Sequence, residues 1–156
     1  MSATGTGTGT STRNDGGTKA AVRAWPRVVL VDDEGGFRSA LRELLQEEGI
    51  AVVGEARDGK SGLAEAEALQ PDVVLMDLRM PTMDGIEATQ RIKQVLPHTQ
   101  VIILTAYEDA SLTRSAEEVG AYAYLVKGCS GRLIRDLVIR AGHVKWSQED
   151  RDFRQQ

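Results

Sequence analysis

Residues 73–81 read VVLMDLRMP, so four apolar residues lead directly to the carboxylate of Asp77 and a proline follows at position 81. A continuous apolar run, without polar residues in alternation, predicts a strand that is covered on both faces. Four further runs have the same character: VVLV at 28–31, VV at 52–53, VIIL at 101–104 and YAYLV at 122–126. We therefore predict five buried strands.

Helical patterns separate these runs. Apolar residues recur at three- and four-residue spacing at Phe37, Ala40, Leu41, Leu44 and Leu45, and again at Ile134, Leu137, Val138 and Ala141. Weaker versions of the pattern begin at Leu63, Ile86 and Leu112. Five strands alternating with five helices predict an α/β fold, in which right-handed crossovers produce a parallel sheet with helices on both faces.

The length of the chain, 156 residues, suits one domain and is too short for two. We predict a disordered Thr/Gly-rich tail over residues 1–25, one domain over residues 26–145 and a short C-terminal tail over residues 146–156. The single cysteine, Cys129, has no partner for a disulfide and no companions for a metal site.

The charge and hydropathy of the chain disfavour several classes of function. There are 19 Lys and Arg against 23 Asp and Glu, a net charge of -4, which offers no electrostatic reason to expect nucleic-acid binding. No run approaches the roughly 18 apolar residues of a membrane span, and the N-terminus lacks the apolar region of a signal peptide. We expect a cytoplasmic protein that contacts neither membrane nor nucleic acid directly.

Polar side chains stand at the ends of four predicted strands. Asp32 and Asp33 end the first run, Asp77 the third and Thr105 the fourth, and Lys127 follows the fifth. Ligands of a parallel sheet bind outside these carboxyl ends, where the strand order reverses. Each residue alone passes as a turn former or a solvated charge, but three adjacent carboxylates repel and call for a counter-cation. Mg²⁺, which combines carboxylates with phosphate oxygens and water, suits the site.

These five positions, with MDLRMPTMDG around the middle acid, closely resemble the receiver domain of bacterial two-component response regulators. The resemblance extends from about Arg27 to Val144. It implies a flavodoxin-like (βα)5 sandwich with strand order 2-1-3-4-5, whose reversal lies between the strands that carry Asp33 and Asp77. It also implies a phosphorylation-dependent signalling switch, not an enzyme in the usual sense, because only its own phosphorylation and dephosphorylation are catalysed.

The resemblance implies a role for each site residue. Asp77 would be the phosphoacceptor, attacking a phosphohistidine of a sensor histidine kinase or a phosphotransfer protein. Asp33, Asp77 and the backbone carbonyl of Arg79 would hold Mg²⁺, and Asp32 would act through a bound water. Lys127 would pair with a phosphoryl oxygen.

Other positions would transmit the change to a downstream effector protein. The Thr105 hydroxyl would move to bond a phosphoryl oxygen, and Tyr124 occupies the position of the family's switch aromatic. A core tyrosine with a solvated hydroxyl explains Tyr124 as well. Strand alternation predicts that Tyr122 faces the same side as Tyr124. Arg79 and Tyr107 would flank the phosphoryl pocket and influence dephosphorylation.

Two alternatives to a stand-alone switch stay open. The stretches LRMPTMDG and LTAYEDA, and Gly128 in place of the family's frequent proline, resemble receivers that usually precede a helix-turn-helix. The chain would then be a transcription regulator whose C-terminal DNA-binding domain is missing from it. The other alternative is a phosphorylation-independent scaffold that binds through the last helix with Trp146 and Phe153. The sequence names neither the kinase nor the output partner, and the formation of a homodimer stays open.

Two phosphate-handling motifs compete with this interpretation. The stretch GEARDGKS at 54–61 matches the P-loop pattern letter for letter. However, a P-loop surrounds phosphates with backbone N–H groups, and Glu55 and Asp58 would place negative charge beside them. We favour a turn at Asp58 and the next glycine that opens a helix. A dehalogenase-type phosphatase would need a second acid two residues after Asp77, where Arg79 stands.

Overall fold

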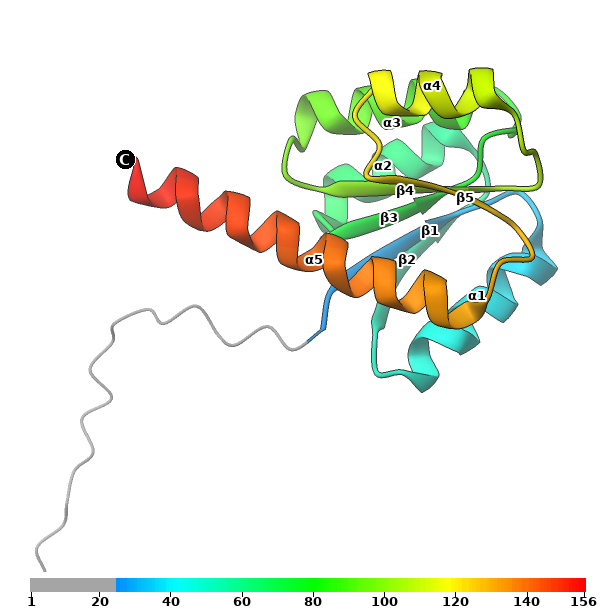
Figure 1. Ribbon diagram of the computed structural model, residues 1–156, viewed down its shortest axis with the longest axis horizontal. Coiled ribbons are helices and arrows are strands. Elements are labelled where there is room, and N and C mark those ends of the chain that lie inside the picture. The colour runs from blue at the N-terminus through cyan, green and yellow to red at the C-terminus, as the bar shows by residue number, and fades with distance from the viewer. Residues whose placement is uncertain (1–24) are drawn as a thin grey trace, which may run out of the picture.

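The computed structural model describes residues 25–156, so the tail predicted over residues 1–25 lies, apart from its last residue, outside the described part of the chain. Strands and helices alternate as predicted (Figure 1). In chain order they are β1 (Arg27–Val31), α1 (Gly35–Glu47), β2 (Ala51–Ala56), α2 (Gly59–Leu69), β3 (Val73–Met76), α3 (Gly85–Val95), β4 (Gln100–Thr105), α4 (Ala110–Glu118), β5 (Ala123–Val126) and α5 (Gly131–Arg154).

The five strands form one parallel sheet in the order β2-β1-β3-β4-β5, which confirms the predicted α/β class and strand order. The order reverses beside β1, since β2 lies on one side of it and β3 on the other. The carboxyl ends of β1 and β3 are therefore neighbours at one edge of the sheet, where the first and third apolar runs end in acids.

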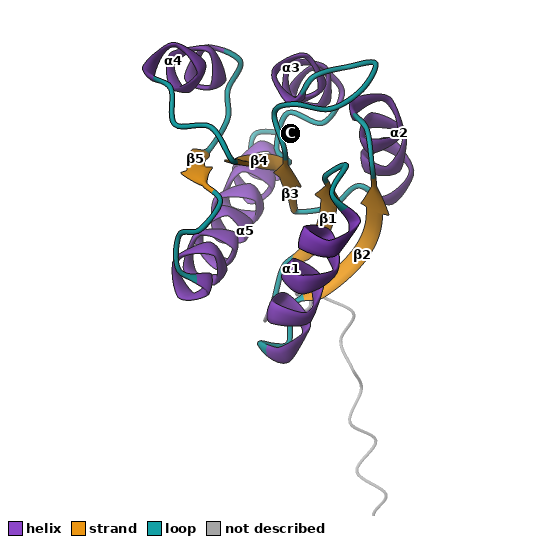
Figure 2. Cartoon of the chain, turned by 90° about the vertical axis from the view of Figure 1, so that its right-hand side faces the viewer, coloured by secondary structure: helices purple, strands orange, loops and turns teal. Residues whose placement is uncertain are grey.

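Helices cover both faces of the sheet, with α1 and α5 on one side and α2, α3 and α4 on the other (Figure 2). Successive residues of one strand accordingly enter different cores. Val28 and Leu30 of β1 pack in a cluster with Leu45 and Val138, while Val29 and Val31 pack in the other cluster. This double coverage explains why the strands read as continuous apolar runs.

One expectation about side-chain direction is wrong. Tyr122 packs against the cluster on the α1 and α5 side, whereas Tyr124 packs against the cluster on the opposite side. The regular alternation does not extend to Tyr122, because β5 begins only at Ala123. Tyr122 lies in the bend before the strand, where its backbone N–H donates to Val101 O at 2.7 Å.

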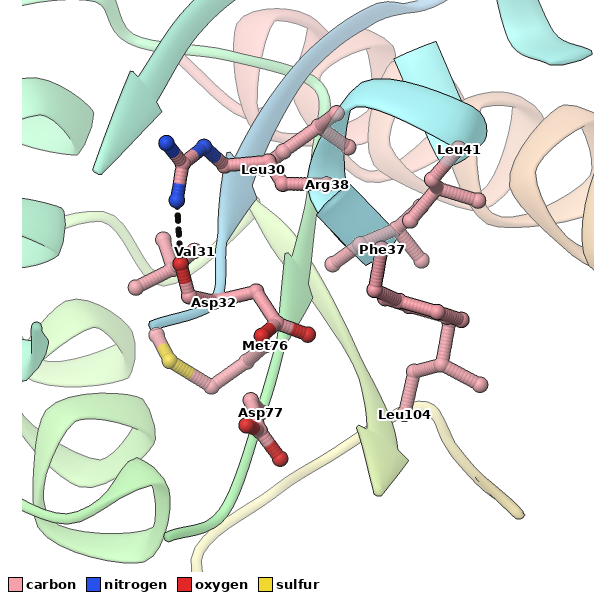
Figure 3. Close-up of a pocket in the computed structure, with 10 residues that line it drawn as sticks. Leu30, Val31, Asp32, Phe37, Arg38, Leu41, Met76, Asp77 and Leu104 are labelled. Carbon is pink, nitrogen blue, oxygen red and sulfur yellow. Dashed lines mark hydrogen bonds between the residues drawn. The ribbon is translucent and has the colours of Figure 1, made fainter. Parts of the chain in front are cut away.

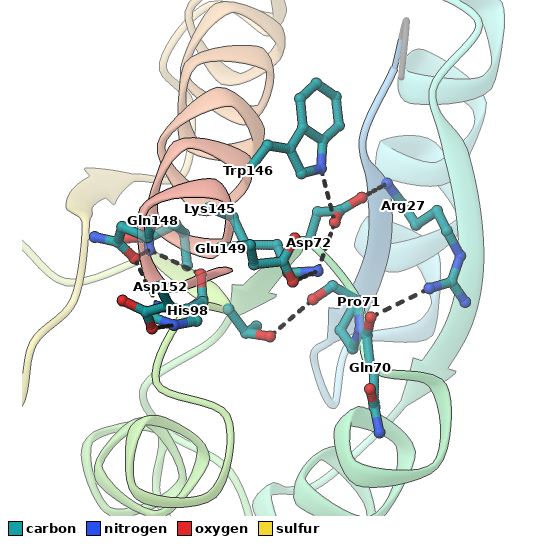
Figure 4. Close-up of polar contacts among 12 residues, drawn as sticks. Arg27, Gln70, Pro71, Asp72, His98, Lys145, Trp146, Gln148, Glu149 and Asp152 are labelled. Carbon is teal, nitrogen blue, oxygen red and sulfur yellow. Dashed lines mark hydrogen bonds and ion pairs between the residues drawn. The ribbon is translucent and has the colours of Figure 1, made fainter. Parts of the chain in front are cut away.

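The last helix is longer than the sequence pattern predicts. The residues assigned to a short C-terminal tail, 146–156, continue α5 in helical conformation as far as Arg154. A polar cluster at the amino-terminal edge of the sheet anchors this helix, as Figure 4 shows. Asp72 accepts hydrogen bonds from Arg27 N at 2.8 Å, from Lys145 Nζ at 2.9 Å and from Trp146 Nε1 at 3.0 Å.

Asp72 is almost fully buried, at 4% exposure. Burial by itself would raise its pKa, but the hydrogen bonds from Arg27, Lys145 and Trp146 outweigh that effect and hold the pKa below its ordinary value. Two later residues of α5 contact His98, which lies just before β4. Its Nδ1 lies 3.3 Å from Gln148 Oε1, and its Nε2 lies 2.5 Å from Asp152 Oδ2. Within residues 25–156, none of the helices, α5 included, has the length and apolar character to cross a membrane.

Candidate functional site

The three predicted carboxylates meet at the carboxyl-terminal edge of the sheet. The backbone of Asp77 stays in the sheet's hydrogen-bond pattern, because its N–H donates to Val31 O at 2.9 Å, and Asp32 N donates likewise to Ala56 O at 3.0 Å. Asp32 and Asp77 are buried and Asp33 is exposed. One oxygen of each carboxylate of Asp32, Asp33 and Asp77 lies within 4.8 Å of the others, so a single cation could contact all three.

Lys127 reaches this acidic cluster from the end of β5. Its Nζ lies 2.8 Å from Asp32 Oδ2 and 3.5 Å from Asp77 Oδ2, and its backbone N–H donates to Thr105 O at 2.6 Å. The ammonium also lies 4.4 Å from the centre of the Phe37 ring, a cation–π arrangement. Burial by itself would lower the pKa of Lys127, but the adjacent carboxylates of Asp32 and Asp77 raise it above its ordinary value.

The position of Asp77 disfavours its ionised form. Burial and the negative charge of Asp32 raise its pKa from 3.8 to about 6, and Asp33 adds to the shift. Lys127 and the Leu78 backbone N–H, which donates to Asp77 Oδ1 at 2.8 Å, counteract it only in part. Three carboxylates with one ammonium leave two negative charges uncompensated, so the donor set fits a divalent, oxygen-preferring cation such as Mg²⁺.

The loop after β3 brings the start of α3 back against the backbone of Asp77. Gly85, the first residue of α3, donates from its N–H to Leu78 O at 2.7 Å. A Cβ at Gly85 would stand 2.0 Å from Asp77 O, which no side chain tolerates. This glycine therefore permits the close approach that holds the backbone of Asp77 against the start of α3.

The other predicted site residues lie around this centre. Thr105 is fully buried at the end of β4, and its Oγ1 accepts a hydrogen bond from Tyr107 N at 3.4 Å. The Tyr124 hydroxyl donates to Tyr107 O at 2.5 Å. The guanidinium of Arg79 stacks on the Tyr107 ring, with 4.2 Å from Cζ to the ring centre. Among the described contacts, no hydrogen bond joins Thr105 or Tyr124 to Asp77.

The P-loop interpretation of residues 54–61 is wrong. Gly54 is a residue of β2 paired with Val29, and therefore no part of a phosphate-binding loop. The N-terminus of α2 is already occupied, because the Asp58 carboxylate caps it by accepting from Ser61 N at 2.7 Å. Gly59 abuts the carbonyl of Met83, since a Cβ there would lie 2.2 Å from that oxygen. The expected turn at Asp58 that opens a helix is confirmed.

Three residues at the start of α1 contact the site, although the sequence patterns do not identify them as site residues. Glu34 Oε1 lies 3.7 Å from Lys127 Nζ, the Phe37 ring contacts the same ammonium, and Arg38 Nη1 donates to Asp32 O at 2.6 Å. Figure 3 shows Phe37 and Arg38 beside Asp32 and Asp77. Their place directly after the acidic pair was the available signal, but Phe37 also fits the helix's apolar pattern.

Residues 28–139 match the family model of the response regulator receiver domain. The chain belongs to this family. Transcriptional regulatory protein PdtaR of Mycobacterium tuberculosis is 44% identical to this receiver over 126 residues, which cover 79% of this chain and 58% of PdtaR. The chain thus spans a little over half the length of this curated relative.

Solved receiver structures share the fold. The signal receiver domain of NarL from Mycobacterium tuberculosis superposes with a TM-score of 0.73 at 34% identity, over 76% of this chain and 97% of that one. A chain of the CheX-CheY-BeF3-Mg+2 complex from Borrelia burgdorferi gives a TM-score of 0.70 at 25% identity, over 73% of this chain and 87% of that one.

Proposed function

We propose that this receiver domain accepts a phosphoryl group on Asp77 in a Mg²⁺-dependent reaction and thereby changes its affinity for an effector protein. The observation that carries the proposal is the convergence of Asp32, Asp33 and Asp77 within 4.8 Å, with the Lys127 ammonium 3.5 Å from Asp77. The solved CheX-CheY complex, which contains Mg²⁺, supports the choice of cation.

In the proposed reaction, a carboxylate oxygen of Asp77 attacks the phosphorus of a phosphohistidine on a histidine kinase or phosphotransfer protein. An O–P bond forms, the P–N bond breaks, and the electron pair stays on the imidazole nitrogen, which takes up a proton. The product on this chain is an acyl phosphate. Lys127 would pair with a phosphoryl oxygen, which its position supports, since its Nζ lies 3.5 Å from Asp77 Oδ2.

Mg²⁺ would be held by Asp33, Asp77 and the Arg79 carbonyl, with Asp32 acting through water, and would supply the positive charge that a phosphoryl group needs beside three acids. Without the cation, the approach of the negatively charged phosphoryl group to Asp77 is unfavourable, since two negative charges of the acidic cluster are uncompensated. Burial is the largest cause of the raised pKa of Asp77, about 6, and the negative charge of Asp32 is the second.

The switch would run through Thr105 and Tyr124. Thr105 Oγ1 holds only a long hydrogen bond, 3.4 Å from Tyr107 N, so its hydroxyl can be drawn toward a phosphoryl oxygen at little cost. Tyr107 would move with it, and its carbonyl accepts the hydrogen bond of the Tyr124 hydroxyl. The surface of α4, β5 and α5 would change as a result.

Phos-tag electrophoresis with acetyl phosphate tests the proposal. We expect a shifted band with Mg²⁺ that is absent in EDTA and absent in Asp77→Asn. Asp58→Asn, which replaces an acid that only caps α2, should be phosphorylated like wild type. No shifted band for wild type, or an unchanged band for Asp77→Asn, would contradict the assignment of Asp77.

A second candidate output is transcription regulation, because PdtaR is described as a transcriptional regulatory protein and extends beyond the matched region. Under this proposal the receiver would be the input part of a DNA-binding protein. The reading frame after Gln156 tests it: about 60 further codons with a helix-turn-helix pattern would support the proposal, and a stop codon directly after Gln156 would contradict it.

A further inference from the structure

The loop between β1 and α1 carries two of the three acidic residues and leads into a helix without a side-chain N-cap. Glu34, at the N-cap of α1, makes no side-chain cap hydrogen bond, and the helix begins with Gly35 and Gly36. The four other helices between residues 25 and 156 begin with an Asp or Ser side chain that accepts from their first turn. Without such a cap, the loop is held by contacts of Asp32, whose N–H donates to Ala56 O at 3.0 Å and whose Oδ1 accepts from Glu34 N at 2.8 Å.

Arg38, the fourth residue of α1, adds a side-chain contact to this loop. Its Nη1 donates to the backbone carbonyl of Asp32 at 2.6 Å, as Figure 3 shows, and its Nε donates to Glu55 Oε1 at 3.2 Å. The guanidinium is a rigid planar fork, so one side chain can serve both acceptors with fixed geometry. Glu55 on β2 thus orients Arg38, and Arg38 ties the loop to the sheet.

The hydrogen bond from Arg38 to the Asp32 carbonyl also fixes the position of the Asp32 carboxylate. With its backbone held, Asp32 presents Oδ1 to Glu34 N at 2.8 Å and Oδ2 to Lys127 Nζ at 2.8 Å. Asp33 follows directly in the same loop, so its direction depends on the same backbone. Residues that orient metal ligands in this manner typically change metal affinity by 10- to 100-fold when they are replaced.

We propose that Arg38 is a positioning residue, which holds the β1–α1 loop so that Asp32 and Asp33 converge with Asp77 on one Mg²⁺ ion. The inference rests on the proposed Mg²⁺-dependent function of this site. Arg38 touches the carbonyl of Asp32 and none of the three carboxylates, so it acts through the backbone alone.

Arg42 provides a matched control on the same helix. Its Nη1 pairs with the other oxygen of Glu55 at 2.7 Å, and none of its described contacts reaches Asp32. Arg38→Gln and Arg42→Gln remove the same positive charge from the same carboxylate. Loss of charge would, if anything, strengthen Mg²⁺ binding in both variants, whereas loss of the carbonyl contact weakens it only in Arg38→Gln.

Calorimetric titration of the full chain with MgCl2 tests the proposal. We expect a dissociation constant about tenfold higher in Arg38→Gln than in wild type, and unchanged or lower in Arg42→Gln. Arg38→Lys should lie between them, because one ammonium cannot hold both acceptors. In phosphorylation by acetyl phosphate, Arg38→Gln should need about tenfold more Mg²⁺ for half-saturation, with a rate at saturating Mg²⁺ within about twofold of wild type.

Amide hydrogen exchange in the absence of metal distinguishes a loosened β1–α1 loop from a general loss of stability. In EDTA, the amide of Glu34, which donates to Asp32 Oδ1, should exchange its hydrogen faster in Arg38→Gln and at the wild-type rate in Arg42→Gln. If Arg38→Gln does not fold, Arg38→Lys takes its place with the same criteria, because it keeps the positive charge but cannot hold the Asp32 carbonyl and Glu55 together.

The outcomes separate this inference from the proposed function. Wild-type protein that binds Mg²⁺ and is phosphorylated, together with equal Mg²⁺ affinity in Arg38→Gln and Arg42→Gln, would overturn the positioning role and leave the function standing. Wild-type protein that binds no Mg²⁺ would overturn both. Weaker Mg²⁺ binding confined to Arg38→Gln, with faster exchange at Glu34, would establish the role.

Discussion

Replacement of Asp77 by asparagine should stabilise the protein when no divalent cation is present. The ionised carboxylate is buried at 6% exposure and lies beside the negative charges of Asp32 and Asp33. Asparagine has nearly the same shape but no charge. Its side-chain oxygen can still accept the hydrogen bond that Leu78 N now donates to Asp77 Oδ1. The exchange therefore removes the repulsion while it keeps the local geometry.

The pKa of Asp77 sets the size of the effect. A rise from 3.8 to about 6 corresponds to roughly 3 kcal/mol, at about 1.4 kcal/mol per pKa unit. The attraction of Lys127 already enters that value. Some of the penalty is relieved by water at the open side of the site, so we expect Asp77→Asn to raise the free energy of unfolding by about 1 to 3 kcal/mol at pH 7.5.

The pH dependence follows from the direction of the shift. Between pH 3.8 and about 6 the folded protein holds the Asp77 proton more tightly than the unfolded chain does. The stability of wild type therefore falls, through this group, as pH rises across that window. The full penalty is present above about pH 6, and below pH 3.8 both states are protonated. The advantage of Asp77→Asn should accordingly grow from near zero at acid pH to its full value at neutral pH.

Urea unfolding in EDTA, followed by tryptophan fluorescence, measures this difference. Trp146 is a suitable reporter, because it contacts Asp72 at the opposite edge of the sheet from Asp77. Equal m-values for both proteins would allow their free energies to be compared. Asp58→Asn is the control: the lowered pKa of this half-buried acid arises chiefly from the backbone hydrogen bond of Ser61, so its replacement should bring no gain.

Mg²⁺ provides a second test. Mg²⁺ at 100 times its dissociation constant should stabilise wild type by about 2.7 kcal/mol and Asp77→Asn by less, so the difference should shrink or reverse. The reasoning is refuted if Asp77→Asn is no more stable than wild type at pH 7.5 in EDTA. A stability difference of the same size at pH 4 and pH 7.5 would refute it as well.

Three further predictions follow from other contacts. Asp72→Ala should destabilise the protein by about 1–3 kcal/mol in urea unfolding, because Arg27 N, Lys145 Nζ and Trp146 Nε1 lose the buried carboxylate to which they donate. The Lys145 ammonium keeps Glu149 Oε1 at 3.0 Å, so its charge stays paired. Gly85→Ala should cost about 1–3 kcal/mol and slow phosphorylation by acetyl phosphate, because the new methyl group would displace the Asp77 backbone. Gly36→Ala should raise the free energy of unfolding by up to about 1 kcal/mol, because alanine favours the helix and its Cβ meets nothing within 4 Å.

Matched variants separate these effects from unspecific ones. Asp136→Ala breaks a half-buried surface ion pair with Arg135 and should change stability by less than about 1 kcal/mol. A similar loss in Asp136→Ala and Asp72→Ala would mean that burial of the Asp72 contact is unimportant. Equal effects of alanine at Gly85 and Gly36 would contradict the close approach at Gly85.

Much of the fold could be predicted from the sequence because its signals are local. Continuous apolar runs mark strands that are covered on both faces, and the helical spacing between them implies parallel crossovers. The acids at the ends of the runs then have to share one edge of the sheet. For this reason the sequence alone predicts Asp32, Asp33, Asp77 and Lys127 as one site. The strand order itself came from the resemblance to receiver domains.

Other features were decided only by the tertiary structure. Asp72 and Lys145 are 73 residues apart, and no local pattern pairs a buried carboxylate with one particular lysine of a later helix. The same contact helps α5 to continue through residues that read as a polar tail. Arg38 looks like an ordinary solvent-facing residue of α1 until the fold brings β2, with Glu55, and the Asp32 carbonyl within its reach. Local periodicity specifies which residues are buried, whereas the partner of a buried polar group depends on how the elements pack.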